Sequence, residues 1–360
     1  MRRLIKTGAA SAMYWTGIAG LMGKISKTDA TPLILGYHRV VENYDICVIN
    51  SIAPMLISTR TLEQHLDWVG RHYRFVDLDD IIQNSHDKGS TEKPMAAITF
   101  DDGYADVYQN AFPLLKRKGI PFAVFAVTDL VGTNRLQLHD ELYLLLSRAF
   151  FVWPSPRKHL RKLLSQIDVL PGYIGGLNEL TVSPFRTTRA FLHSLPQEKI
   201  IAILKLLRQY GELQDADTKD FRSVDWEMLS EMRKAGVVIG SHTRSHAFLT
   251  NESKRKVEDE VRGSKQKLEL MLGGEIRHLA YPDGRFSNSI VKAAAAAGYV
   301  GGYTTCQHRD IRHPGLTFPR RVLWEESCMD VFHRSSPAIM GCQVNGVFDF
   351  TGGCNISHQS

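Results

Sequence analysis

Short, unbroken apolar runs recur along the 360-residue chain, and a turn follows each one. The apolar positions are continuous instead of alternating, as in strands that are buried on both faces of a sheet. We therefore expect buried parallel strands at these places. They are LILGY (33–37), RFVDL (74–78), AAITF (96–100), FAVFAV (122–127), VVIG (237–240), HLAY (278–281) and YVGGY (299–303).

Amphipathic segments with helical spacing lie between these runs. Gly119 and Gly236 close two of them, as glycines do at helix C-termini. Strand and helix alternate with short links, which predicts a parallel sheet covered by helices. About seven such units favour a (β/α) barrel over an open sheet. The expected helices cover residues 61–71, 106–119, 224–236, 251–274 and 287–298.

One long segment interrupts the alternation. Residues 135–222 are rich in Leu, Arg and Lys, and we expect a mainly helical insertion between two barrel strands. We therefore divide the chain into an N-terminal segment (1–30), a barrel (31–335) and a C-terminal tail (336–360), whose structure the pattern does not indicate.

The net charge of +6 is concentrated at the N-terminus. Residues 1–28 contain five basic residues and no acid, so the rest of the chain is close to neutral. The basic pI is therefore no sign of nucleic-acid binding, and we expect no nucleic-acid partner.

The N-terminal segment has 17 uncharged residues between Lys6 and Lys24. Three interpretations stay open: a membrane anchor, a helix on an anionic membrane surface, and a helix docked on the protein. Contact with a membrane surface through residues 1–28 is thus one expectation, and the location is membrane-associated or cytoplasmic in a bacterium. A cleaved secretion signal is less favoured, because no small-x-small site precedes Lys24. The five cysteines form no C-x-x-C motif, so we expect mostly thiols, with a Cys342–Cys354 bridge as an alternative.

Polar residues follow the predicted strands at their C-terminal ends. His38 follows the first strand, Asp101 and Asp102 follow 96–100, and His242 and His246 follow 237–240. The C-terminal ends of barrel strands meet at one rim, where active sites form. These side chains are therefore expected to lie together.

Two pairs suggest metal chemistry. His242 and His246 are four residues apart, so they would share one face of a helix capped near Ser241 and could ligate one ion. Adjacent carboxylates repel unless a cation coordinates one of them. The other would then be free to act as a base near a metal-activated water. The alternative for the aspartates is an ordinary helix cap and turn.

These motifs resemble a known family. TFDDGY (99–104) and SHTRSH (241–246) resemble the first two motifs of the polysaccharide deacetylases, carbohydrate esterase family four. YHRV (37–40) and AFPLLKRKGIPFAVF (111–125) add to the likeness, which covers residues 32–130 and 223–325. The resemblance implies a distorted (β/α) barrel of about seven strands.

The resemblance also implies roles. Asp101 would be the general base, and Asp102, His242 and His246 would hold a divalent metal. Zinc is expected first, with cobalt, nickel and manganese as alternatives. The implied reaction removes the N-acetyl group of an N-acetylhexosamine in a polysaccharide and yields acetate and an amine. Substrate-binding residues are expected to be Tyr104, Tyr281, Pro282, His38 and Arg320.

The third family motif departs from its usual form. In AYPDG (280–284) Ala280 replaces an arginine that orients the base, and Asp283 replaces a tyrosine whose backbone N–H helps to bind the oxyanion. A subgroup that acts on exported N-acetylglucosamine polymers also has AYP here. Arg320 or Arg321 could supply the missing guanidinium. The candidates for the general acid are His308, His313 and His333.

Other functions stay open at this point. They are a carbohydrate O-acetyl esterase with the same metal and base, a hydrolase of small cyclic amides, and a catalytically silent glycan-binding protein.

Overall fold

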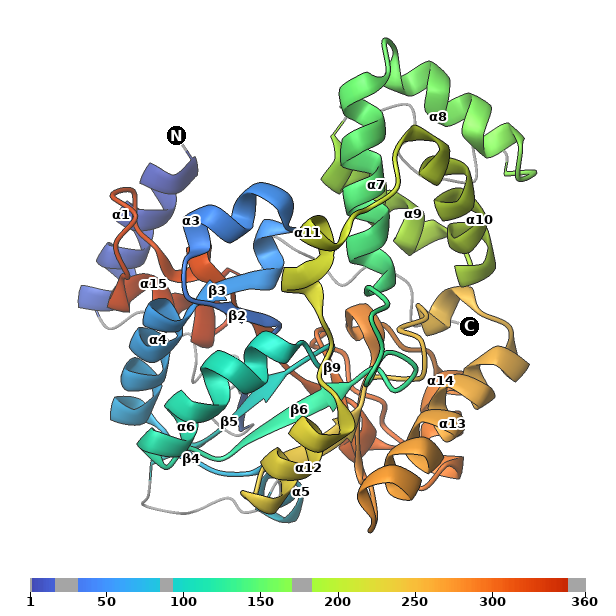
Figure 1. The fold of residues 1–360 in the computed structure, drawn as a ribbon. Coiled ribbons are helices and arrows are strands. Elements are labelled where there is room, and N and C mark those ends of the chain that lie inside the picture. The colour runs from blue at the N-terminus through green and yellow to red at the C-terminus, as the bar shows by residue number, and fades with distance from the viewer. Residues whose placement is uncertain (1, 17–31, 85–92, 170–182, 349–360) are drawn as a thin grey trace.

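The core of the molecule is a parallel sheet that nearly closes on itself (Figure 1). The computed structural model describes residues 2–16, 32–84, 93–169 and 183–348. In these ranges nine strands form the sheet, in the order β10-β9-β8-β7-β6-β5-β1-β11, with β4 also paired to β5. The strands are β1 (Leu33–Tyr37), β4 (Arg74–Phe75), β5 (Met95–Phe100), β6 (Phe122–Ala126), β7 (Val238–Ser241), β8 (His278–Ala280), β9 (Gly301–Thr304), β10 (Phe318–Pro319) and β11 (Arg321–Val322).

A single segment, residues 318–322, connects the two edges of this sheet. Its first half, β10, pairs with β9, and its second half, β11, pairs with β1. Arg320 lies between the halves, and its backbone N–H donates to the carbonyl of Thr304 at 2.7 Å. With β10 and β11 taken as one interrupted strand, and β4 left aside, seven strand positions surround the core. The expected distorted barrel of about seven strands is confirmed.

Helices cover the outside of the barrel where the apolar periodicity predicts them. Gly119 ends α6 with a left-handed backbone (φ +64°), as expected. The predicted strand 74–78 is shorter than expected, because the Asp77 carboxylate accepts from the N–H of Asp80 and helix α5 begins at Leu78. The outer helices are α4 (Thr59–His72), α5 (Leu78–Asn84), α6 (Phe112–Lys118), α12 (Trp226–Lys234), α13 (Lys254–Leu272) and α14 (Asn288–Ala296).

Residues between β6 and β7 form a separate helical layer with its own apolar core (Figure 1). Leu145, Phe191 and Ile203 are among its fully buried side chains. A mainly helical insertion was expected here. Its helices are α7 (Leu138–Val152), α8 (Pro156–Ser165), α9 (Pro184–Ser194), α10 (Gln197–Leu207) and α11 (Asp215–Thr218).

Before the first outer helix, the chain forms a small accessory sheet. Strands β2 (Arg39–Val41) and β3 (Leu56–Ser58) pair in parallel, and the short helix α3 (Tyr44–Cys47) lies between them in the chain. The carboxylate of Glu325 accepts from both the N–H and the hydroxyl of Ser58, which ties this sheet to the segment that follows β11.

The two ends of the described chain pack against each other. Helix α1 (Arg2–Trp15) lies on α15 (Pro337–Val344), with Ala10 and Cys342 buried between them. Cys342 is a thiol, so the predicted alternative of a Cys342–Cys354 bridge is wrong.

The expectation of membrane contact concerns residues 1–28. The structure does not describe residues 17–28, which include Lys24 and Lys27, nor does it describe Cys354. No described helix has the length and apolar character to cross a bilayer. Membrane-surface contact stays a prediction.

Candidate metal centre and catalytic base

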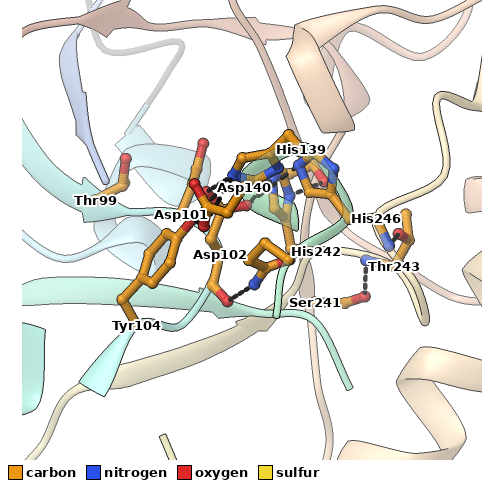
Figure 2. Close-up of polar contacts among 12 residues, drawn as sticks. Thr99, Asp101, Asp102, Tyr104, His139, Asp140, Ser241, His242, Thr243 and His246 are labelled. Atoms are coloured by element: carbon orange, nitrogen blue, oxygen red, sulfur yellow. Dashed lines mark hydrogen bonds and ion pairs between the residues drawn. The ribbon is translucent and has the colours of Figure 1, made fainter. Parts of the chain in front are cut away.

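The four side chains singled out from the strand ends lie together in a buried cluster (Figure 2). Asp101 and Asp102 follow β5, and His242 and His246 follow β7. The Nε2 atoms of His242 and His246 lie 3.5 and 3.2 Å from Oδ1 of Asp102. One ligand atom from each of Asp102, His242 and His246 lies within 4.8 Å of the others, the spacing that a shared metal ion requires.

The loop that carries the two histidines is not a helix, contrary to expectation. Thr243 and His246 have left-handed backbones, with φ of +66° and +57°. The hydroxyl of Ser241 accepts from the N–H of Thr243, and that of Thr243 accepts from the N–H of His246, each at 3.1 Å. These side-chain contacts replace the hydrogen bonds of a helix. The imidazoles still meet, with ring centroids 4.9 Å apart.

A carboxylate that the sequence did not single out holds this loop. Glu260, on α13, is fully buried and accepts from the backbone N–H groups of Arg244 and Ser245, both at 2.9 Å. It also accepts from the Ser245 hydroxyl. Glu260 therefore ties the middle of the histidine loop to α13.

The two imidazoles differ in their surroundings. Nδ1 of His242 lies 2.8 Å from the carbonyl oxygen of Ala280, so Nδ1 carries the proton and Nε2 offers its lone pair to the cluster. Burial lowers the pKa of His242 to about 4, which keeps the ring neutral. Burial also acts to lower the pKa of His246, but the negative charge of Asp102 outweighs it and the pKa is raised.

Asp102 shows that this group suits a cation. Both of its oxygens are buried without a hydrogen bond of regular geometry from the described residues, and the nearby imidazole nitrogens of His242 and His246 are 3.5 and 3.2 Å from Oδ1. An ionised carboxylate without donors is costly in a protein interior unless a cation compensates it. Two imidazoles and one carboxylate are also a donor set that divalent zinc and its neighbours accept. The residues present therefore fit a divalent metal.

Asp101 is engaged differently. Its two oxygens accept from the two terminal nitrogens of Arg320, at 2.7 and 2.6 Å, and both side chains are buried. Burial raises the pKa of Asp101, but Arg320 and His242 outweigh it, so the pKa lies below its usual value. The methyl group of Ala280 offers no hydrogen bond to Asp101, whereas the Arg320 side chain donates to it. Arg321 is half-buried in β11.

Asp283 lies at the same rim with a left-handed backbone (φ +55°). Its carboxylate faces the insertion, where Oδ2 lies 3.1 Å from Nε2 of His193 on α9. The same oxygen is 2.9 Å from Nε of Arg285. The Asp283 carboxylate thus forms ion pairs with His193 and Arg285. The backbone N–H of Asp283 is the group that could donate a hydrogen bond to an oxyanion.

The insertion also brings a histidine to the cluster, which the sequence did not indicate (Figure 2). Nε2 of His139 lies 2.8 Å from the Tyr104 hydroxyl and 3.9 Å from Oδ2 of Asp102. The amide of Gln137 donates to the backbone carbonyl of Asp102 at 2.8 Å. The apolar periodicity of the sequence predicts helices in the insertion, but it does not indicate where those helices pack on the barrel. His139 could therefore not be assigned to the site from the sequence.

The expected substrate-binding residues lie in or beneath the wall of the site. Tyr104 and Tyr281 are fully buried, and their hydroxyls bond inside the protein, to Asp140 at 2.6 Å and to the Leu316 carbonyl at 2.9 Å. Pro282 is buried as well. His38 is partly exposed at the end of β1, close enough to influence both Asp101 and Asp102 electrostatically.

The three candidates for the general acid are spread over the C-terminal third. His308 and His313 line a small cavity beside α14. His333 is exposed in the loop that precedes α15. Apart from His242 and His246, the histidines that the structure places near the carboxylate pair are His38 and His139.

Comparison with known proteins decides the family. The profile of the family described as polysaccharide deacetylase matches residues 88–155 and 183–302, which is just over half of the chain. The chain belongs to the polysaccharide deacetylase family. It is an enzyme of that class, and the matched ranges contain the aspartate pair and the histidine loop.

Relatives of this deacetylase support the assignment. It is 21% identical over 301 residues to YxkH of Bacillus subtilis, whose name also assigns it to the polysaccharide deacetylases; the match covers 83% of this chain and 73% of that protein. It is 29% identical over 140 residues to the poly-beta-1,6-N-acetyl-D-glucosamine N-deacetylase of Staphylococcus epidermidis. That match covers 36% of this chain and 48% of the relative.

Solved structures show the same fold. IcaB from Ammonifex degensii superposes on the deacetylase with a TM-score of 0.52 at 19% identity, over 88% of this chain and 97% of that one. The Streptococcus pyogenes deacetylase PplD, in complex with acetate, gives a TM-score of 0.51 at 16% identity, over 82% and 93%.

Proposed function

We propose that this deacetylase is a metal-dependent hydrolase that removes N-acetyl groups from an N-acetylhexosamine-containing polysaccharide. One observation carries the proposal: a buried Asp102–His242–His246 group lies next to Asp101, a second carboxylate that a buried arginine orients. The first group suits a divalent metal, with zinc first and cobalt, nickel or manganese as alternatives. The second suits a general base.

The proposed chemistry follows from the roles of these residues. A divalent cation, when bound, supplies a Lewis acid that polarises the acetamide carbonyl and activates a water. Asp101 accepts the proton of the attacking water, and Arg320 keeps Asp101 ionised and aimed. The backbone N–H of Asp283 donates to the developing oxyanion. His38 lines the pocket. When the tetrahedral centre collapses, the C–N bond breaks, the proton taken up by Asp101 passes to the leaving nitrogen, and acetate and the amine are released.

The glycan is proposed from the relatives. Staphylococcal relatives are named for poly-β-1,6-N-acetylglucosamine, which makes N-acetylglucosamine polymers the first substrates to test. A carbohydrate O-acetyl esterase, a small cyclic amide hydrolase and a silent glycan-binding protein remain alternatives that the products distinguish.

The test is acetate release from N-acetylglucosamine oligomers of β-1,4 and β-1,6 linkage, with chelator and with each metal added back. We expect acetate and one new amine per cleavage, only in the presence of metal. D101N should lose this activity and keep its metal. Acetate without amine would favour the esterase, and no metal-dependent release from any N-acetylhexosamine-containing glycan, neutral or acidic, would sink the proposal.

A further inference from the structure

A large cavity opens beside the proposed catalytic centre. It lies between α13, α14 and the loop after the histidine motif, and its volume is about 890 Å³. Ligand-binding cavities typically measure roughly 300–1,000 Å³. Leu249, which lines it, is three residues after His246. On the other side Arg285 lines it and contacts Asp283. The cavity therefore lies at the end of the barrel that carries the proposed catalytic centre, although the residues of that centre do not line it.

Basic side chains dominate its wall. Lys254, Arg262, Arg285 and Lys292 face it, against two acids. Both acids are engaged: Glu252 accepts from the backbone N–H of residue 197 at 2.6 Å, and Glu258 lies 4.0 Å from Lys254.

The positive charge of this wall is only partly compensated. Arg285 is paired with Asp283. Of the ion pairs among the described residues, none includes Arg262 or Lys292. Arg262 is on α13 and Lys292 on α14, so two exposed cations without an ion pair among the described residues line the cavity from different helices.

Backbone and hydroxyl donors add to this field. Both helices begin at the cavity, since their first residues, Lys254 and Asn288, line it. Helix N-termini present N–H groups and a partial positive charge. The Oγ1 atom of Thr250, also in the wall, is buried and has no hydrogen-bond partner among the described residues. These donors suit an anion.

The basic surface extends along α14. A second cavity of about 290 Å³ shares Asn288 and Lys292 with the first and adds Arg309 and Arg312. Its acid, Asp310, is buried and accepts from the backbone N–H groups of residues 312 and 313, so one carboxylate stands against two guanidinium groups there.

We propose that the large cavity binds the carboxylate of a uronic acid, so that the substrate is an acidic polysaccharide in which uronic acid accompanies N-acetylhexosamine. This inference rests on the proposed deacetylation. A neutral N-acetylglucosamine polymer gains one ammonium group with each acetate lost, and a basic cavity repels such a chain. An acidic chain keeps its carboxylates, which guanidinium groups bind through charge-assisted hydrogen bonds.

The test compares two oligosaccharides of equal length. One is heparosan oligosaccharide, in which N-acetylglucosamine alternates with glucuronate, and the other is a neutral N-acetylglucosamine oligomer. With heparosan, the double variant R262Q/K292Q should raise KM at least about 10-fold and leave kcat within about 2-fold. The neutral oligomer should show no change. R255Q is the matched control, because Arg255 is exposed on α13 and does not line the cavity.

The outcomes separate the two proposals. If the metal-loaded wild type deacetylates the neutral oligomer with an equal or lower KM, or if R262Q/K292Q leaves the heparosan KM unchanged, the acidic-substrate inference fails and the deacetylation stands. If neither oligomer releases acetate, the deacetylation fails. Calorimetry then tests whether the D101N protein binds heparosan hexasaccharide in the cavity. If D101N binds it and the added R262Q/K292Q substitutions abolish the binding, the proposed carboxylate site is supported. If D101N does not bind it, or if the added substitutions leave the affinity unchanged, the proposed site is overturned.

Discussion

The guanidinium of Arg320 binds both carboxylate oxygens of Asp101, at 2.7 and 2.6 Å, across 219 residues of sequence. Both groups are buried. The two parallel hydrogen bonds fix the orientation of the carboxylate plane, and the positive guanidinium favours the ionised carboxylate. The proposed base therefore depends on a residue far outside its own motif.

Replacement of Arg320 should damage catalysis and stability together. R320M leaves a buried carboxylate unpaired, which costs roughly 3–5 kcal/mol of unfolding free energy. We expect kcat for acetate release to fall at least about 100-fold. R320K keeps the charge without the planar fork and should retain more stability than activity. R321M, at the neighbouring position, is the control and should change kcat less than about 3-fold. Wild-type kcat in folded R320M would remove Arg320 from the mechanism.

Metal should stabilise the protein through Asp102. A ligand at 100 times its Kd adds about 2.7 kcal/mol to folding, because it binds only the native state. Zinc should therefore raise the Tm of the chelator-treated wild type. D102N should show little shift, since the amide replaces a buried anionic ligand. Both proteins are compared in thermal unfolding and by bound metal per chain. An equal shift in D102N would contradict the assigned ligand set.

Glu260 should control metal affinity without touching the metal. Its carboxylate holds two backbone N–H groups of the histidine loop, so E260Q should loosen the positions of both imidazoles. Loss of such supporting contacts typically weakens metal binding 10–100-fold. E258Q is the matched control, because Glu258 is a nearby exposed acid on α13 that pairs with Lys254 and not with the histidine loop. Titration with a competing chelator measures the affinity, and equal values for E260Q and E258Q would refute the role.

Acid should destabilise the fold partly through His65. This residue is buried in α4, where its Nδ1 lies 3.3 Å from the Tyr37 hydroxyl, and burial lowers its pKa to about 4. Between pH 6.5 and 4 the unfolded chain therefore binds a proton that the folded protein does not. The unfolding free energy should fall by about 1.4 kcal/mol per pH unit from this group, roughly 3 kcal/mol in total.

The check is the difference between wild type and H65Q. Urea denaturation at several pH values should show a shallower loss of unfolding free energy for H65Q below pH 6.5, with little difference in slope above pH 7. H72Q, at an exposed position of the same helix, is the control. Parallel curves for wild type and H65Q would show that His65 does not carry this effect.

The sequence predicted the barrel well because its signals are local. Runs such as 96–100 and 122–127 are buried on both faces and therefore apolar throughout, and glycines such as Gly119 mark real helix ends. The expectation failed where side chains replace regular backbone bonding. Ser241 and Thr243 bond to the loop backbone and prevent the predicted helix.

The candidate site was predicted only in part, for a similar reason. Residues that follow a strand directly, such as Asp102 and His242, are placed by the strand itself. His139, His193 and Glu260 reach the site from helices, and their contacts depend on how those helices dock. Arg320 was one of two candidates, and the choice between it and Arg321 required the position of the interruption between β10 and β11.

The segment 318–322 joins the two edges of the barrel and carries Arg320 at the junction. A ribosome synthesises this segment only after nearly nine-tenths of the chain, so the aspartate that is to act as base stays without its arginine until then. Under the proposed mechanism, a nascent or truncated chain that stops before Arg320 already contains all three residues of the proposed metal group, yet cannot hydrolyse its substrate. Activity would begin only when the barrel is complete.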